Sequence, residues 1–291
     1  MALNQQDHRV STALVTGGAS GLGREFCIQL AARGWEIVVA DIDLVGAQET
    51  LDAIAAAGGT GYVETLDVTN IDHWLPLRSK LQNRWSRLDL LVNNAGVCSA
   101  GKIGGEPIAA IRRVCEVNLF GVIHGCHTFV PWLQTTAPGG AIVNIASVAA
   151  VLNAPAMAAY NVSKAGVLAY TETLYAELHG LGIGVTVVLP GFFSSHLLTK
   201  GTFSDELYRR IATDYVQHST ITPERVVRET LLAVERGKLH AAMGRRVRLA
   251  WLIKRIAPSW FHRLVAWIFA RNEAKHSAPV EGMLPIGDID S

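Results

Sequence analysis

Residues 10–34 read VSTALVTGGASGLGREFCIQLAARG, and this stretch decides the fold. The β-branched and apolar run at 10–15 predicts a strand, and residues 24–33 predict a helix that ends at Gly34, a typical C-terminal signal. Between them lies a turn, residues 16–23, with the spacing Gly-x-x-x-Gly-x-Gly. The glycines let the backbone turn tightly and let a phosphate approach the free N–H groups of the helix N-terminus. The arrangement therefore predicts a dinucleotide-binding turn.

The rest of the chain repeats the alternation of strand and helix. Further strands are predicted at 35–40, 60–66, 89–92, 141–146, 183–189 and 240–243, and further helices at 44–57, 71–87, 107–135, 157–179 and 222–236. The crossovers are long enough for parallel pairing, and such units are right-handed. We therefore expect an α/β fold, a Rossmann-type doubly wound parallel sheet of about seven strands with helices on both faces. A hydrophobic content of 49% suits a sheet that is buried on both faces.

Composition narrows the class further. The 291 residues suffice for one large α/β domain. The polar N-terminus predicts no signal peptide, and no uncharged apolar run reaches the roughly 18 residues of a spanning helix. The four cysteines form no CxxC pair, which favours free thiols in the cytoplasm, and the histidines lack ligand spacing, so no catalytic metal is expected.

An acidic residue, Asp41, ends the second predicted strand, 18 residues after Gly23. At this place in the fold a carboxylate accepts hydrogen bonds from an adenosine ribose. A 2′-phosphate would meet a like charge there, and the glycine turn holds no Arg or Lys. The sequence therefore favours NAD over NADP. The alternative is an ordinary turn or N-cap acid.

Residues 147–164 carry candidate catalytic groups. Tyr160 and Lys164 stand four apart on a predicted helix and so share a face. A free Tyr has a pKa of about 10, and a nearby positive charge lowers it, so a tuned phenol can carry a proton during reaction. Ser147 follows the predicted strand 141–146, and its hydroxyl is placed to meet Tyr160 and a substrate oxygen. Such a Tyr-x-x-x-Lys pair also occurs by chance in many helices.

The motifs together resemble the short-chain dehydrogenase/reductase family over roughly residues 9–245. The matching motifs are Thr16-Gly17-x3-Gly21-x-Gly23, Asp67, Asn93-Asn94-Ala95-Gly96, Asn118, Ser147, Tyr160-x3-Lys164 and Pro190-Gly191. The resemblance implies an NAD(P)-dependent oxidoreductase that acts on a CH–OH group. It also implies a homodimer or homotetramer built on the long helices.

The resemblance implies a role for each catalytic candidate. Tyr160 would be the general acid/base, and Ser147 would orient the substrate oxygen. Lys164 would bind the nicotinamide ribose and lower the pKa of Tyr160, and Asn118 would sustain a water-linked proton relay from Lys164.

The resemblance also implies the cofactor contacts. Asp67 and Val68 would flank the adenine, and residues 94–96 would line the adenosine side. Where the family often has a Thr against the carboxamide, this chain has Ser195, which keeps the hydroxyl. The implied cofactor-binding residues are Gly17, Ser20, Gly21, Leu22, Gly23, Asp41, Asp67, Val68, Asn94, Ala95, Gly96, Tyr160, Lys164, Pro190, Gly191 and Ser195.

Residues 192–221 are expected to cover the substrate, because ligands of this fold lie beyond the carboxyl ends of the strands. Their many large apolar residues favour a hydrophobic secondary alcohol or its ketone, although the same side chains would also serve to pack the lid. A catalytically idle dinucleotide-binding scaffold is the alternative function. The complete Ser, Tyr, Lys and Asn set argues against it, since a binder needs no tuned phenol.

The end of the chain extends beyond the catalytic domain expected at 1–244. Residues 236–272 hold nine Lys or Arg and no acid. Residues 245–273 predict a basic, Trp-rich helical extension of two short helices broken at Pro258, followed by an extended tail at 274–291. The extension would lie on an anionic membrane surface through 245–271, or pack on a sister subunit or over the active site. Nucleic-acid binding is not expected, because no recognition motif accompanies the charge.

Overall fold

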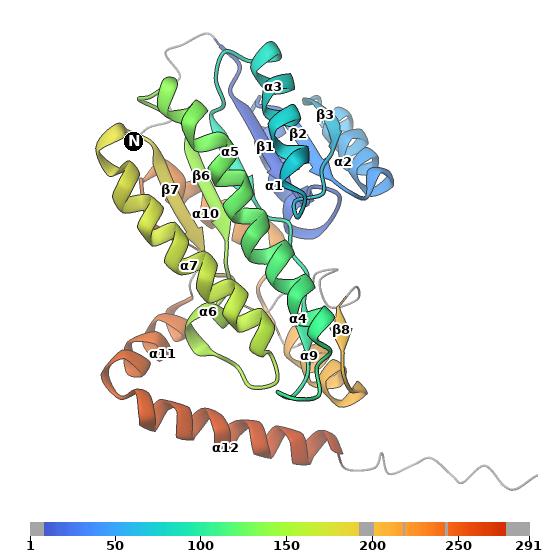
Figure 1. Cartoon of the computed structure of the whole chain (residues 1–291), viewed down its shortest axis with the longest axis vertical. Helices are drawn as coiled ribbons and strands as arrows, with labels where there is room; N and C mark the ends of the chain where they lie inside the picture. Colours follow the sequence, from blue (N-terminus) through green and yellow to red (C-terminus); the bar gives the residue numbers. More distant parts are fainter. Residues whose placement is uncertain (1–8, 192–200, 218, 242–243, 278–291) are drawn as a thin grey trace, which may run out of the picture.

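The structure is a computed structural model and describes residues 9–191, 201–217, 219–241 and 244–277. A seven-stranded sheet forms its centre, and all of its neighbouring strands pair in parallel (Figure 1). In the order β3-β2-β1-β4-β6-β7-β9, the strands are Thr60–Thr65, Glu36–Asp41, Thr12–Thr16, Leu90–Asn93, Ala141–Ile145, Gly184–Val188 and His240–Ala241. The predicted fold class is confirmed, with strand ends that differ by one or two residues, while residues 242–243 of the last predicted strand lie outside the described part of the chain.

The strand order places the ligand site. The chain builds outward from β1 to β3 on one side, and from β4 to β9 on the other, so the direction of winding reverses between β1 and β4. In sheets of this kind ligands bind beyond the carboxyl ends of the strands at that reversal. All five residues of β1 are buried, because helices cover both faces.

One face of the sheet is covered by α1 (Gly21–Ala31), α2 (Leu44–Ala56) and α10 (Pro223–Glu235). Phe26 and Leu231 belong to the apolar core that these helices share with the sheet. The side chain of Thr222 caps α10, as its position before a proline predicts.

The other face is covered by α3 (Trp74–Arg84), α5 (Gly121–Thr135) and α7 (Ala158–Leu178). Trp74 is fully buried there, in an edge contact with Phe129 at 6.2 Å between ring centroids. Short 3₁₀ turns precede α3 and follow α7, at Ile71–His73 (η1) and His179–Leu181 (η3).

The helix predicted over 107–135 contains an interruption. It consists of α4 (Ile108–Cys115), a π-helical turn η2 (Glu116–Phe120) and α5. The turn centres on Asn118, whose side chain hydrogen-bonds the backbone of Val97 on a neighbouring loop. Such π-turns insert one extra residue and are frequent at functional sites. Sequence periodicity predicts the helix but not this local widening.

Several elements within or near the predicted lid were missed. They are α6 (Ala149–Leu152), α9 (Glu206–Gln217), and a two-stranded parallel sheet of β5 (Ser99–Ala100) and β8 (Thr202–Phe203). Strands of two residues are too short to show a pattern in sequence. Residues 192–200 and 218 lie outside the described part of the chain, and with them Ser195 and the predicted lid residues Phe192, Phe193, Leu197 and Leu198.

The C-terminal extension consists of α11 (Arg245–Ile256) and α12 (Pro258–Ser277), and α12 lies at the lower end of the molecule in Figure 1. The chain breaks at Pro258 as expected, but α12 has 20 residues and is not short. The extended tail predicted from 274 is wrong for 274–277, where Ala and Lys favour helix and Glu273 is held by Tyr208 of α9. Residues 278–291 lie outside the described chain. No helix among the described residues is long and apolar enough to cross a membrane.

Candidate active site

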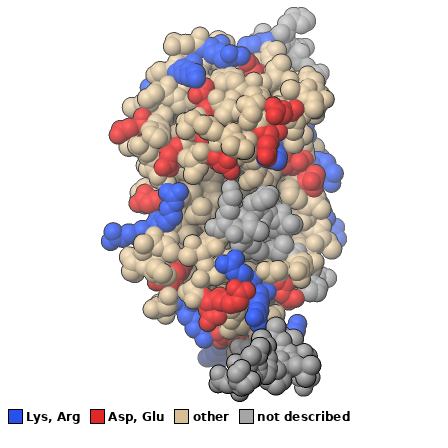
Figure 2. Space-filling model, turned by 90° about the vertical axis from the view of Figure 1, so that its right-hand side faces the viewer, with Lys and Arg blue, Asp and Glu red and all other residues tan. Residues whose placement is uncertain are grey.

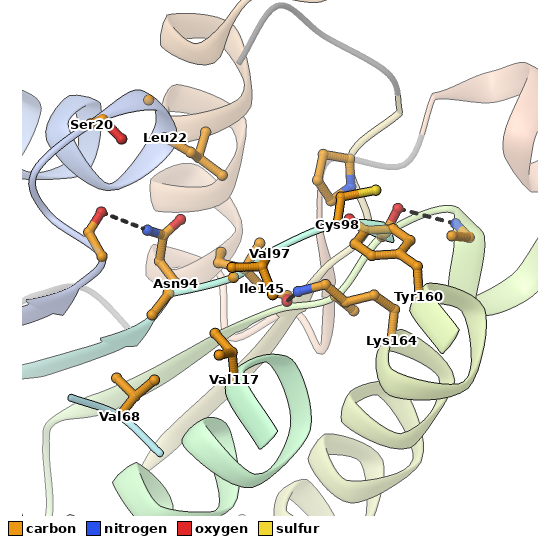
Figure 3. A pocket seen from close by; sticks show the side chains of 18 of the residues that line it. Ser20, Leu22, Val68, Asn94, Val97, Cys98, Val117, Ile145, Tyr160 and Lys164 are labelled. Atoms are coloured by element: carbon orange, nitrogen blue, oxygen red, sulfur yellow. Dashed lines mark hydrogen bonds between the residues drawn. The ribbon is translucent and has the colours of Figure 1, made fainter. Parts of the chain in front are cut away.

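A pocket opens beyond the carboxyl ends of the central strands (Figure 3). Its walls come from the glycine turn, the ends of β2, β4 and β6, and the start of α7. Gly23 and Asn118 do not line the pocket, and Ser195 lies outside the described residues. The predicted residues that line it are Gly17, Ser20, Gly21, Leu22, Asp41, Asp67, Val68, Asn94, Ala95, Gly96, Ser147, Tyr160, Lys164, Pro190 and Gly191.

The glycine turn presents an anion-binding edge to the pocket. Gly21 opens α1 with a φ of +53°, and no atom lies within 4 Å of the place where a Cβ would stand. Ser20, the N-cap, makes no side-chain capping bond, and the first turn of α1 holds no acid. The first N–H groups of the helix therefore face open space, which suits a diphosphate. A Cβ on Gly23 would collide with the carbonyl oxygen of Gly17, so this glycine is needed for the close packing of the turn.

The Asn-Asn-Ala-Gly segment after β4 holds the turn in place. The Asn94 side-chain amide donates to the carbonyl oxygens of Thr16 and Gly17, at 2.9 and 3.2 Å. The Thr16 hydroxyl oxygen accepts the backbone N–H groups of Asn94 and Ala95. Asn94 thus forms part of the pocket floor while its polar group supports the glycine turn.

Asp41 ends β2 and lies at the edge of the pocket. Its Oδ2 accepts the Ala19 N–H at 3.0 Å, and its Oδ1 accepts the Asp43 N–H at 2.9 Å. Arg24 is the first basic residue after the turn. Its guanidinium donates to Thr50 and to the backbone of the turn and of α2, and not to Asp41. The carboxylate keeps acceptor capacity toward the pocket, since each oxygen has two lone pairs.

Asp67 and Val68 follow β3 at the far end of the pocket. Burial alone would raise the pKa of Asp67, but hydrogen bonds from the Thr69 hydroxyl and N–H outweigh it. The pKa is therefore lowered, and the side chain remains a carboxylate at neutral pH.

Lys164 lies beneath the other end of the pocket with a relative exposure of 3%. Its ammonium donates to the carbonyl oxygen of Ile145 at 2.7 Å. An ammonium has three donors, and the pocket is the open direction for the other two. Burial lowers the pKa of Lys164 to about 8.

Tyr160 shares the pocket wall with Lys164, whose Nζ lies 5.8 Å from the centroid of the Tyr160 ring (Figure 3). Burial raises the pKa of the phenol above its ordinary value and the Cys98 thiol adds to this, while a hydrogen bond with Ser147 lowers it. The sign is opposite to the one predicted. The ammonium points to the Ile145 carbonyl and lies over the ring, so burial dominates.

Asn118 acts within the protein framework. It is fully buried, its Oδ1 accepts the Val97 N–H at 2.8 Å, and its amide donates to the Val97 carbonyl and the Ser163 hydroxyl. These bonds fix the loop that carries Gly96 beside Lys164. The proton relay that the resemblance implies stays a prediction.

The structure adds pocket residues that sequence reasoning missed. Burial raises the pKa of the Cys98 thiol to about 12, so it contributes a neutral and nearly apolar surface. Cys98 lies two residues after the Asn-Asn-Ala-Gly motif, and this position in the sequence was the signal that could have identified it as a pocket residue. The other missed lining residues are Ile42, Asp43, Leu66, Val97, Arg113, Val117, Ile145, Ala146, Val148, Ala149 and Met157.

Comparison with known proteins defines the class. The family model described as short chain dehydrogenase matches residues 11–205. The chain therefore belongs to the short-chain dehydrogenase family.

Individual relatives agree with this family. "Probable oxidoreductase EphD" of Mycobacterium tuberculosis is 36% identical over 189 residues, which are 65% of this chain and 32% of that protein. The chain thus spans about a third of the length of that relative. 11-beta-hydroxysteroid dehydrogenase A of Sesamum indicum is 30% identical over 275 residues, which are 92% of this chain and 76% of that protein. The crystal structure of a short chain dehydrogenase/reductase from Burkholderia phymatum in complex with NAD has a TM-score of 0.79 at 28% identity, covering 85% of this chain and 95% of that one.

Proposed function

We propose that the protein is an oxidoreductase that transfers a hydride between NAD(H) and a hydrophobic secondary alcohol or its ketone. The observation that carries this proposal is that Ser147, Tyr160 and Lys164 line one pocket together with the glycine turn. A protein that only bound a dinucleotide would not need a phenol hydrogen-bonded to a serine at this place.

Each of these residues has a task that its contacts support. In reduction the neutral Tyr160 phenol donates its proton to the ketone oxygen, and in oxidation its phenolate form takes the proton of the alcohol hydroxyl. Ser147 hydrogen-bonds the phenol and orients the same substrate oxygen. Lys164 binds ribose hydroxyls through the donors that the Ile145 carbonyl leaves free. NAD, when bound, supplies the hydride chemistry.

The pocket fits NAD. The open space at Gly21 and the free helix N-terminus suit the diphosphate. Asp41 has acceptors for the ribose hydroxyls, and its charge opposes a 2′-phosphate. These features support NAD in preference to NADP.

The walls near Tyr160 support an apolar substrate. Cys98, Val148, Ala149 and Met157 line this part of the pocket and offer little polar surface. The sesame relative is named for a hydroxysteroid, which is a hydrophobic secondary alcohol. The same class of substrate fits here.

Self-association is the expected assembly. Phe120 of η2 and Val162 of α7 are 42% and 62% exposed, on helices that cover one face of the sheet. Exposed apolar side chains on neighbouring long helices suit a homodimer or homotetramer contact.

An absorbance assay tests the proposal. The protein is incubated with NAD or NADP and a series of secondary alcohols of increasing apolar size, and reduced nicotinamide is followed. We expect NAD to be preferred and kcat/KM to rise with apolar size. Calorimetric binding of NAD without turnover in either direction, across the alcohols and their ketones, would instead support the idle scaffold.

A further inference from the structure

The C-terminal helices expose apolar side chains at helical spacing. On α12, Trp260, Leu264, Trp267 and Ile268 are 56%, 37%, 55% and 42% exposed. Their separations of four, three and one residues put them on one face of the helix. In an ordinary surface helix the apolar face packs on the core of the protein. In α12 this apolar face is exposed instead.

The preceding helix has the same feature. On α11, Leu249, Leu252 and Ile256 are 58%, 55% and 75% exposed, and their spacing of three and four residues again defines one face. We call these seven side chains of α11 and α12 the apolar stripe. Single exposed apolar residues need no explanation, but a periodic set on two joined helices indicates a binding surface.

The opposite faces of both helices are packed against the protein. Phe261 of α12 is buried, and Phe269 packs on the apolar cluster that contains Tyr208 and Ile211 of α9. Glu273 accepts hydrogen bonds from the Tyr208 hydroxyl, at 3.1 Å, and the Lys102 ammonium, at 2.9 Å. The helices are therefore docked through their inner faces, and the apolar stripe is held outward.

The inner face of α11 is anchored in the same way. Its Trp251 makes an edge contact with His240 of β9 at 5.6 Å between ring centroids. Lys254 donates to the Val151 carbonyl oxygen at 2.7 Å. Both helices thus have a fixed orientation relative to the sheet.

Charge decides which partner the stripe fits. On the face in Figure 2, basic and acidic side chains are mixed over the body of the molecule. Residues 236–272, in contrast, hold nine Lys or Arg and no acid. Two copies that met through this region would bring like charges together, whereas an anionic surface is complementary.

Aromatic and basic groups are also paired beside the stripe. The Arg271 guanidinium lies 4.7 Å from the centroid of the Trp267 ring, which belongs to the stripe, and on the inner side of α11 the Arg255 guanidinium lies 5.6 Å from the centroid of the Trp251 ring. Trp with flanking Arg and Lys is the composition of helices that lie at a membrane interface.

We propose that the apolar stripe of α11 and α12 docks the protein on an anionic lipid bilayer. The two helices lie in the plane of the interface, with the stripe among the acyl chains and the surrounding Arg and Lys at the lipid headgroups.

Helix α12 also packs close to the wall of the pocket. Phe269 of α12 packs on the same small cluster as Met157, and Met157 lines the pocket near Tyr160. Docking would therefore bring the pocket near the lipid in which a hydrophobic alcohol dissolves. This consequence rests on the proposed function, but the docking itself does not.

Vesicle flotation tests the docking without reference to turnover. The full chain is mixed with vesicles of phosphatidylcholine, or of phosphatidylcholine and phosphatidylglycerol in equal parts, and floated on a density gradient. We expect the protein to float with the anionic vesicles only, and to be released by high salt. The double variant Trp260→Ser/Trp267→Ser should partition into the anionic vesicles at least about tenfold more weakly than the parent.

A matched control removes exposed apolar groups elsewhere. Val45 of α2 and Leu75 of α3 are 74% and 51% exposed, and Val45→Ser/Leu75→Ser should float like the parent. Thermal unfolding checks that both variants are folded. The proposal is overturned if the parent stays in the soluble fraction with anionic vesicles, or if the Trp variant floats equally well. Loss of a larger oligomer in the Trp variant, with no flotation of the parent, would assign the stripe to a second copy of the chain.

Discussion

Replacing Lys164 with methionine should leave the folded protein at least as stable near neutral pH, although we assign Lys164 to cofactor binding. Lys164 is 3% exposed, and burial lowers the pKa of its ammonium from 10.5 to about 8. At about 1.4 kcal/mol per pKa unit, burying this charge costs roughly 3 kcal/mol while the group is protonated in both states.

The pH window follows from the direction of this pKa change. The folded pKa lies below the unfolded one, so between about pH 8 and 10.5 the unfolded chain binds more protons. Stability of the parent therefore rises with pH across that window. Below it the cost is fully present, and above it the cost is gone because Lys164 is neutral in both states.

The variant Lys164→Met removes the charge at similar size but leaves the Ile145 carbonyl without its donor. An unsatisfied buried acceptor costs about 1–3 kcal/mol. At pH 7 the variant should therefore be as stable as the parent or up to roughly 2 kcal/mol more stable. Near pH 10.5 the variant should be the less stable of the two, because only the loss of the hydrogen bond remains.

Urea unfolding at both pH values measures this, without added cofactor and at one protein concentration. The stability difference between variant and parent should change by roughly 3 kcal/mol between the two pH values. The control Lys275→Met removes an exposed ammonium of α12 and should stay within about 0.5 kcal/mol of the parent throughout. A difference for Lys164→Met that is the same at both pH values would refute the reasoning.

Two further substitutions test the cofactor site. Asp41→Ala should lower the NAD/NADP ratio of kcat/KM, because the charge that opposes a 2′-phosphate is gone; an unchanged ratio counts against our reading of Asp41. Gly23→Ala should weaken NAD binding by about tenfold or more and lower Tm, because its methyl group would meet the Gly17 carbonyl and the Asn94 amide. Gly180→Ala, with open space around the added methyl, is the matched control, and equal effects at both glycines would contradict the account.

The parts of the fold that sequence predicts are those set by long, regular patterns. The apolar runs predict the seven strands, and the turn at Gly17–Gly23 predicts how the first strand connects to the first helix. The four-residue spacing of Tyr160 and Lys164 was enough to place both on one wall of the pocket, since α7 is a regular helix there.

Features that depend on contacts between distant segments could not be predicted. The π-turn carries Asn118, whose amide group hydrogen-bonds Val97 on another loop, and this contact cannot be seen in the local sequence. The raised pKa of Tyr160 depends on burial, for which a pattern in one helix gives no measure. Residues 274–277 are helical and follow Glu273, which is held against Tyr208 by a hydrogen bond between distant segments. The sequence does not show this contact, and the Pro and Gly residues further along suggested an extended tail.

The central claim is that the Tyr160 phenol moves the proton while other groups hold the cofactor. The most direct measurement compares Tyr160→Phe with the parent in turnover of a competent alcohol and in the Kd of NAD by calorimetry. We predict that turnover falls by about 10²–10⁴-fold, the range for a general acid/base, while Kd changes by less than about threefold. Turnover that survives the substitution, or NAD binding that is lost to the same degree as turnover, would contradict it.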